Sequence, residues 1–323
     1  MNILSHFTPS VCIAAAAMAA CGLHAQEAFP KRSVTIVVPY AAGGVTDHFA
    51  RVLGNKLSKQ WGQSVVVDNR AGGGTIIGTQ LVSKAPADGH TLLFTSYGFT
   101  ANSVLRQDLP YASTSFRPVG LLGNSHNVLL VTNRLKPKSL NALIADAKAR
   151  PGSLKMGSSG LGSSPHIGAE FFAKLTGIDF THVPYRGQGP AMTDLTAGVV
   201  DAMFDGMSSY AQVKGGFVGA VAIAAPQRHP SAPEIPTFKE LGLDFVAGTW
   251  FGMLAPSGVP DQVVNKINAD MRLALQDADT KAQVVKTGLS VVMSTPEAFG
   301  QFLNQEASKL QSLVSQGAKI DLN

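Results

Sequence analysis

Short apolar runs rich in β-branched residues alternate along the chain with segments whose apolar residues recur at helical spacing. Residues 33–38 read Ser-Val-Thr-Ile-Val-Val and predict a buried strand, and the runs at 64–67 and 91–95 predict two more. Between the first two strands, apolar residues recur every fourth position from 49 to 61, which places them on one face of a helix. A second helix is predicted before the third strand. This βαβαβ order predicts a parallel sheet with right-handed crossovers.

The same alternation resumes after residue 127 and predicts a second α/β unit. Its expected strands are residues 128–131, 155–157, 181–183, 202–204 and 218–223, and its expected helices are residues 139–150, 167–175 and 192–199. Beyond about residue 251, the pattern predicts a strand, a helix over 260–276, a short strand at 291–292 and a helix over 296–315. Two strong helices around one lone strand indicate that the chain returns to the first unit.

These patterns predict two α/β domains, of which the first is discontinuous. We expect the first domain to contain residues 26–127 and 252–323, and the second to contain residues 128–251. The chain would cross between them near Asn127–Thr132 and again near Thr249–Leu254. Two such crossings create a hinge with a cleft between the domains.

The first 25 residues have the features of an export signal. Residues 11–20 are almost entirely apolar, and this run is too short to span a bilayer. The segment ends at Ala25, a small residue of the kind that signal peptidase requires. A lipoprotein signal, with a lipid anchor on Cys21, is the alternative interpretation. Since Cys12 and Cys21 are the two cysteines of the chain, cleavage after Ala25 leaves no disulfide and no thiolate metal site.

Composition and charge exclude several classes of protein. Apolar content of 45% and charged content of 15% are typical of an ordinary globular chain and argue against disorder. The net charge is +5, and no run of five Lys or Arg occurs, so we expect no nucleic-acid partner. The mild positive charge either favours anionic solutes or serves only solubility. The glycine run at 72–78 misses the dinucleotide-binding spacing by one residue, and we expect neither a cofactor nor a metal ion.

A glycine-rich turn, Pro39–Asp47, joins the first predicted strand to the first helix. Gly43 and Gly44 permit close backbone approach, and the free N–H groups at the start of a helix suit a carboxylate or phosphate. Ligands of open α/β sheets bind at the carboxyl ends of strands, where this turn lies. The alternative is that the glycines only make a tight turn and that Asp47 only caps the helix.

A second turn, Gly157–His166, also links a strand to a helix and is rich in serine and glycine. Pro165 fits the first helical turn with Ser164 as its cap, so the turn predicts a second anion cradle. A flexible connector is the alternative. Three further strand ends carry polar residues, namely Ser96, Arg186 and Asp205. Asp205 either meets the ligand or caps the next helix.

Enzymatic interpretations find little support in the sequence. The serine-rich turn does not match the Gly-x-Ser-x-Gly spacing of α/β hydrolases. His166 lies close to Ser163 in sequence, but no motif supplies the orienting group that a catalytic base needs. A secreted hydrolase that uses Ser163 or His166 therefore remains the weaker alternative, and we expect a protein that is not an enzyme.

The chain resembles the Bug family, the extracytoplasmic solute-binding receptors of tripartite tricarboxylate transporters. Five stretches carry the resemblance in this order: Val37–Asp47, Val66–Gly73, Asp88–Leu93, His182–Gly187 and Asp201–Asp205. Each stretch alone is weak evidence, but together they cover nearly the whole chain after residue 29. The first turn departs from the family pattern, which often has Pro where Ala42 stands and Ser where Val45 stands.

The resemblance implies a two-lobed periplasmic-binding-protein type II fold with a ligand cleft between the lobes. It also implies a periplasmic receptor that binds a small carboxylate between the two turns and delivers it to the membrane subunits of a transporter. A dicarboxylate, tricarboxylate, aromatic carboxylate or amino acid would fit, and a ligand-sensing subunit for a signalling receptor is the alternative role. The residues implied in binding are Tyr40, Ala41, Gly43, Gly44, Asp47, Ser96, Ser159, Gly160, Ser163, His166 and Asp205.

Overall fold

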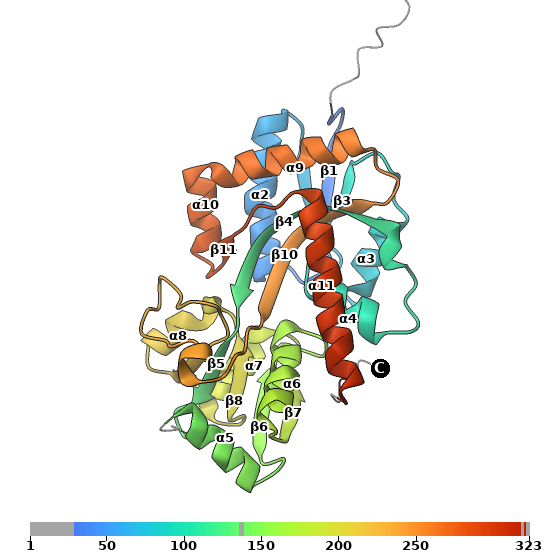
Figure 1. Ribbon diagram of the computed structural model, residues 1–323. Coiled ribbons are helices and arrows are strands. Elements are labelled where there is room, and N and C mark those ends of the chain that lie inside the picture. The colour runs from blue at the N-terminus through green and yellow to red at the C-terminus, as the bar shows by residue number, and fades with distance from the viewer. Residues whose placement is uncertain (1–28, 136–138, 318–319, 321–323) are drawn as a thin grey trace, which may run out of the picture.

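The computed structural model describes residues 29–135, 139–317 and 320, and it folds into two α/β lobes (Figure 1). The predicted export signal, with both cysteines, lies outside these residues. Within the described residues, no helix is both long enough and apolar enough to cross a membrane.

The first lobe is built on a mixed six-stranded sheet in the order β11-β4-β10-β3-β1-β2. Its strands are β1 (Val34–Val38), β2 (Val65–Asn69), β3 (Thr91–Ser96), β4 (Phe116–His126), β10 (Gly248–Pro256) and β11 (Ser290–Val291). β1 pairs in parallel with both β2 and β3, so that Val37 lies opposite Asp68 on one side and Leu93 on the other. The parallel sheet predicted from the βαβαβ order is therefore confirmed for these three strands.

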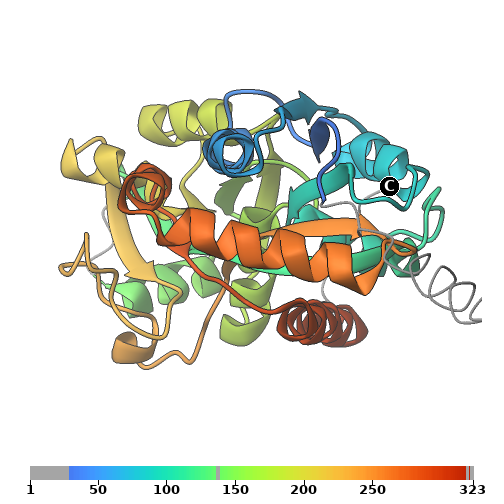
Figure 2. The same ribbon diagram turned by 90° about the horizontal axis from the view of Figure 1, so that it is seen from above.

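Helices cover both faces of this sheet. They are α2 (Val45–Trp61), α3 (Ile76–Ser83), α4 (Gly98–Leu105), α9 (Asp261–Gln276), α10 (Ala278–Val285) and α11 (Pro296–Ser315). Buried residues such as Phe49 and Leu53 of α2 pack with α9 against one face, and Phe299 and Leu310 of α11 pack with α3 and α4 against the other. Figure 2 accordingly shows α2 and α11 on opposite sides of the molecule.

The second lobe has a five-stranded sheet in the order β7-β6-β8-β5-β9. Its strands are β5 (Val128–Thr132), β6 (Leu154–Ser158), β7 (Phe180–Pro184), β8 (Ala202–Asp205) and β9 (Val218–Ile223), and its helices are α5 (Leu140–Ala149), α6 (Ser164–Thr176), α7 (Gln188–Ala197) and α8 (Tyr210–Lys214). All five strands predicted between residues 128 and 223 are confirmed. Phe172, Phe204, Phe238 and Phe245 form an aromatic cluster in its core.

Two short connections join the lobes. Only Asn127 separates β4 from β5, and the chain returns through Ala247 into β10. The two connections are tied together, because Asn127 N donates to Ala247 O at 2.9 Å and Ala224 N donates to Asn127 O at 2.7 Å. This pair of linked segments is the hinge.

The strand directions bring the turns of both lobes to the gap between them. β10 leaves the hinge at Gly248, and its antiparallel partner β3 ends at Ser96 opposite Phe251. β1 runs parallel to β3 and therefore also ends on the hinge side. In the second lobe, Val128 at the hinge pairs with Asp205 at the end of β8, and β6 and β7 run parallel to β8. The carboxyl ends of β1, β3, β6, β7 and β8 thus all face the opposite lobe.

Candidate functional site

Asp47 organises the first turn from inside the protein. Gly43 adopts φ +84°, which a residue without a side chain tolerates. The Asp47 carboxylate, only 4% exposed, accepts a hydrogen bond from Gly43 N at 2.8 Å. Arg51, one helical turn later, pairs with the same carboxylate at 2.9 Å. Burial opposes ionisation, but the hydrogen bonds from Arg51 and Gly43 outweigh it and hold the pKa of Asp47 below its usual value. Asp47 lies in the first turn of α2, and its bond to Gly43 N also ties the glycine turn to the start of the helix.

The first turn presents backbone amides toward the gap. Residues 41–44 are exposed, and the first hydrogen bond of α2 runs from His48 N to Gly44 O at 2.9 Å. The N–H groups of Val45 and Thr46 therefore precede the helical ladder and lie at the positive end of the helix dipole. A Cβ built on Gly44 would meet only Ala41 O, at 3.7 Å, so the space in front of the turn is open. An anion can approach these amides closely.

Tyr40 and Ser96 bring the ends of β1 and β3 together. The Tyr40 hydroxyl and Ser96 Oγ are hydrogen-bonded at 2.7 Å. Burial raises the pKa of Tyr40, so the phenol stays protonated. The Asn69 side chain donates to Tyr40 O at 3.1 Å and ties the turn to β2 as well. The structure thus places Ser96 against the first turn, as a neighbour of Tyr40.

The second turn is capped by Ser163, and the predicted cap Ser164 is wrong. Ser163 has the extended backbone of a capping residue, and its Oγ accepts a hydrogen bond from His166 N. The same hydroxyl donates to Gly160 O at 2.6 Å. Ser164 already belongs to the helix, and its hydroxyl donates to Asn127 Oδ1 at the hinge. The cap lies one residue earlier than predicted because the Ser164 hydroxyl is engaged with Asn127, whereas Ser163 has the extended backbone of a cap.

The buried side chain of His166 holds the second turn in place. Its ring is 2% exposed, and its Nδ1 accepts a hydrogen bond from Gly162 N at 3.0 Å. The ring stacks on His182 of β7, with centroids 4.0 Å apart and planes 3° from parallel. His182 Nε2 in turn pairs with Ser158 Oγ at 2.7 Å. Burial lowers the pKa of His166 to about 3 and that of His182 to about 4, so both rings are neutral at neutral pH.

Two predicted binding residues stay accessible at the tip of this turn. Ser159 and Gly160 are partly exposed, and Gly160 has φ +130°. The third turn lies directly against them, because a Cβ built on Gly160 would lie 3.1 Å from Tyr185 O. The next residue, Arg186, is exposed. The second lobe therefore presents a backbone tip with a cation beside it.

Asp205 lies at the end of β8 but is turned into the protein. Its carboxylate accepts hydrogen bonds from Gly206 N at 2.8 Å and from the hydroxyl of Ser209, within the short helix η3 (Met207–Ser209) that follows β8. Complete burial raises the pKa of Asp205 to about 6. Its bonds are those of a local organiser, like the bonds of Asp47 in the other lobe.

The predicted residues thus form two groups. Tyr40, Ala41, Gly43, Gly44, Asp47 and Ser96 lie together in the first lobe, and Ser159, Gly160, Ser163 and His166 lie together in the second. Among the described residues, no hydrogen bond or ion pair joins one turn to the other. No sequence motif marks Arg51 as the partner of Asp47, and Ser158 lies inside the predicted second turn without a predicted role of its own. His182 lies in one of the five stretches that carry the family resemblance, but its stacking on His166 depends on the pairing of β6 with β7.

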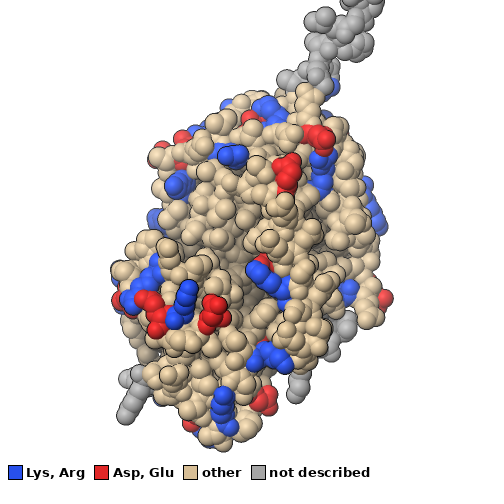
Figure 3. Space-filling view, viewed as in Figure 1, with Lys and Arg blue, Asp and Glu red and all other residues tan. Residues whose placement is uncertain are grey.

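The part of the chain that the structure describes contains no cluster of three His, Cys, Asp or Glu that would hold a metal ion. Lys and Arg are mixed with Asp and Glu over the face shown in Figure 3, so this face carries no basic patch.

Comparison with known proteins places this chain in a family of transport receptors. The model of the tripartite tricarboxylate transporter family receptor matches residues 49–318. The chain is 36% identical to the protein BugT of Bordetella pertussis, over 91% of this chain and 92% of that protein.

Solved structures show the same fold with ligands. A protein of R. palustris in a structure with adipate is 32% identical, with a TM-score of 0.82 over 90% of this chain and 98% of that one. MatC from Rhodopseudomonas palustris, with bound malate, is 33% identical, with a TM-score of 0.79 over 88% of this chain and 100% of that one.

Proposed function

Because this chain belongs to the tripartite tricarboxylate transporter receptor family, we propose that it captures a small carboxylate between its lobes and delivers it to transporter membrane subunits. Similar proteins whose structures contain adipate and malate, both small dicarboxylates, support a dicarboxylate as the ligand. The observation that carries the proposal is the convergence of two strand-end turns, one from each lobe, on the same gap.

Backbone amides, and not a charged clamp, make the first contacts with the ligand in this proposal. The amides that precede the ladder of α2 hold one carboxylate, and the exposed tip at Ser159 and Gly160 closes on the ligand from the other lobe. Arg186 adds a cation beside the tip, which attracts anions to the cleft. Asp47, His166 and Asp205 then act indirectly, since their side chains are bonded within the turns.

Closure of the two lobes on the ligand follows from the position of the two turns on opposite sides of the gap. A ligand that is bonded to both turns has more contacts when the lobes are close, and it therefore shifts the hinge population toward the closed form. A dissociation constant near ~1 μM corresponds to about 8 kcal/mol. A few charge-assisted hydrogen bonds of roughly 1.5–3 kcal/mol each supply much of that energy.

The protein performs no chemistry on its ligand in this account. The Ser163 hydroxyl donates to Gly160 O, and the His166 Nδ1 lone pair is taken by Gly162 N, so these two side chains are not arranged as nucleophile and base. We further propose that the chain is exported to the periplasm and cleaved after Ala25, with lipid attachment at Cys21 as the alternative outcome. Mass spectrometry of the mature N-terminus separates the two.

A thermal-shift screen followed by calorimetry tests the receptor function. We expect malate, adipate or a related carboxylate to raise the melting temperature, and Gly44→Val to abolish that binding. The Val side chain would project into the space in front of the turn, and Gly44 has an ordinary φ of −79°, so the melting temperature without ligand should be unchanged. Undiminished affinity in Gly44→Val would refute the proposed pose. No stabilisation by any carboxylate, amino acid or aromatic acid would refute the receptor function.

A further inference from the structure

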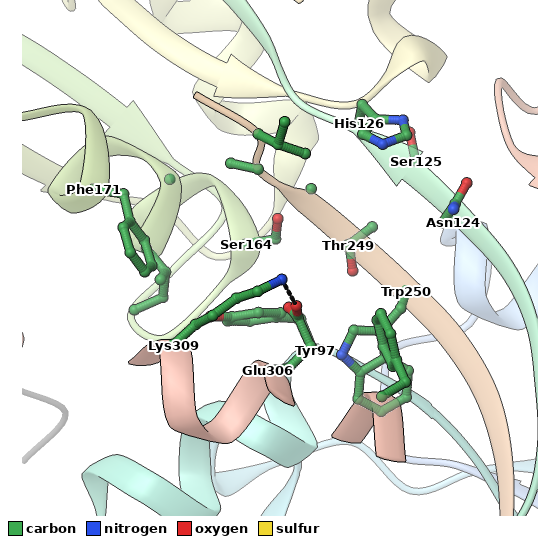
Figure 4. Close-up of a pocket in the computed structure, with 16 residues that line it drawn as sticks. Tyr97, Asn124, Ser125, His126, Ser164, Phe171, Thr249, Trp250, Glu306 and Lys309 are labelled. Carbon is green, nitrogen blue, oxygen red and sulfur yellow. Dashed lines mark hydrogen bonds and ion pairs between the residues drawn. The ribbon is translucent and has the colours of Figure 1, made fainter. Parts of the chain in front are cut away.

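A pocket lies between the lobes at the hinge, where the end of the second turn contributes Ser164 to its wall. Its volume is about 200 Å³, and none of the eleven predicted binding residues lines it. Its walls come from α6 of the second lobe, α11 of the first lobe and the hinge ends of β4 and β10. Figure 3 shows a hollow between the lobes on the face that carries α11, and Figure 4 shows the lining side chains.

Trp250 presents an unsatisfied donor to this pocket. The side chain is 1% exposed, and its Nε1 has no hydrogen-bond partner among the described residues. In Figure 4, the indole nitrogen points toward the side of the pocket where Lys309 and Glu306 lie. Leaving a buried donor unpaired costs about 1–3 kcal/mol, so the site favours an occupant that brings an acceptor atom.

Lys309 supplies a second donor on the same side. Its Nζ is 2.7 Å from Glu306 Oε1, but the Lys309 side chain is 64% exposed and its ammonium has two further N–H groups to offer. The Glu306 side chain is only 15% exposed and carries the opposing charge. An anion would thus bind to Lys309 in competition with Glu306.

The remaining walls are mixed, with polar groups from Asn124, Ser125, His126, Ser164 and Thr249 beside an apolar part. Ile167 and Phe171 contribute from α6, Phe302 from α11, and Val246 from the segment before β10. Val246 is 57% exposed, which leaves apolar surface open to an occupant. Pockets for drug-sized ligands measure roughly 300–1,000 Å³, so this smaller pocket selects a compact molecule.

We propose that the hinge pocket is a second ligand site for a small monocarboxylate with an aromatic or branched apolar body. Its carboxylate accepts hydrogen bonds from Trp250 Nε1 and from Lys309, and its apolar body packs against Phe171 and Phe302. Because Phe171 belongs to the second lobe and Phe302 to the first, occupancy of this site is linked to the angle between the lobes.

Intrinsic fluorescence reports on the site directly, since Trp61 and Trp250 are the only two tryptophans of the chain. In a Trp61→Phe variant, titration with benzoate should change the Trp250 emission in a saturable way. Lys309→Gln in that background should weaken benzoate at least several-fold. Glu306→Gln should strengthen it, because the competing carboxylate is gone. Lys281→Gln, an exposed lysine on α10, should change nothing.

Three results would overturn the proposal, each of them independent of the receptor function. They are no saturable change with benzoate, tighter binding of the matched cation benzylamine, and loss of the benzoate response in Gly44→Val. The last result would place benzoate in the cleft between the two turns. Calorimetry on Trp250→Phe should show weakened benzoate binding with an unchanged affinity for the cleft ligand, and an unchanged benzoate affinity would exclude the indole donor.

Discussion

Asp47→Ala should weaken carboxylate binding although the proposed binding mode gives Asp47 no contact with the ligand. The substitution removes the acceptor of the Gly43 N–H and the partner of Arg51. The turn then loses the constraint that aims its amides into the cleft. We expect the melting temperature to fall by a few degrees and the dissociation constant to rise.

The structure sets the size of this effect. A charge-assisted hydrogen bond such as that from Gly43 N contributes roughly 1.5–3 kcal/mol, and Gly43 is exposed, so its amide regains water and the loss lies at the low end. The Arg51 side chain is 48% exposed, so its ion pair adds at most about 1 kcal/mol. A total of about 1.5–2.5 kcal/mol corresponds to a rise of roughly 10–60-fold in the dissociation constant.

Isothermal calorimetry with malate and with aspartate checks this reasoning, with Asp146→Ala as the matched control. Asp146 and Arg150 form the same i,i+4 pair, but on the exposed surface of α5. The control should bind like the unmodified protein. Unchanged affinity in Asp47→Ala would refute the organising role. A loss confined to aspartate would show instead that Asp47 pairs with the amino group of a ligand.

Three other substitutions test supporting contacts. His182→Gln removes the ring stacked on His166, so ligand affinity should fall several-fold by calorimetry, whereas His229→Gln in the proline-rich loop should not change it. Gly288→Ala would place its Cβ 2.5 Å from the backbone of η3 in the other lobe, so small-angle scattering should show a larger separation between the lobes. Gly317→Ala is the control, because Gly317 has a similar positive φ but open space around it, and the lobe separation should not change. The pKa of Asp205 is raised to about 6, so the folded protein holds this proton more tightly than the unfolded chain. This group alone therefore lowers stability from about pH 4 to pH 6, opposite to the rise that the depressed pKa values of His166 and His182 produce over the same range. Urea unfolding should show a steeper rise of stability with pH in Asp205→Asn than in the unmodified protein.

Much of the fold was predictable because its strands are continuous apolar runs bounded by turns. β4 was missed, although it is the longest strand, because Pro118, Gly120 and Gly123 interrupt its pattern. Packing explains both glycines: a Cβ on Gly120 would lie 2.8 Å from the Asn268 side chain, and one on Gly123 would lie 2.9 Å from Phe49. The two glycines that interrupt the strand pattern are therefore required by contacts with α9 and α2, and these contacts cannot be inferred from the neighbouring residues in the sequence.

The candidate site likewise has one part that the sequence predicts and one part that it does not. Both glycine-rich turns could be located from sequence, because a turn between strand and helix has a local signature. The inward orientation of Asp47 and His166 could not, since it depends on partners such as Arg51 and His182. The hinge pocket had no signature at all, because the fold brings its residues together from five separate segments.

A crystal structure of the protein with the carboxylate selected by the thermal screen tests the central claim most directly. The account predicts one carboxylate within hydrogen-bonding distance of the amides of Val45 and Thr46, with the tip at Ser159 and Gly160 closed over the ligand from the other lobe. A high-affinity ligand bound outside this cleft, with both turns still facing solvent, would contradict it.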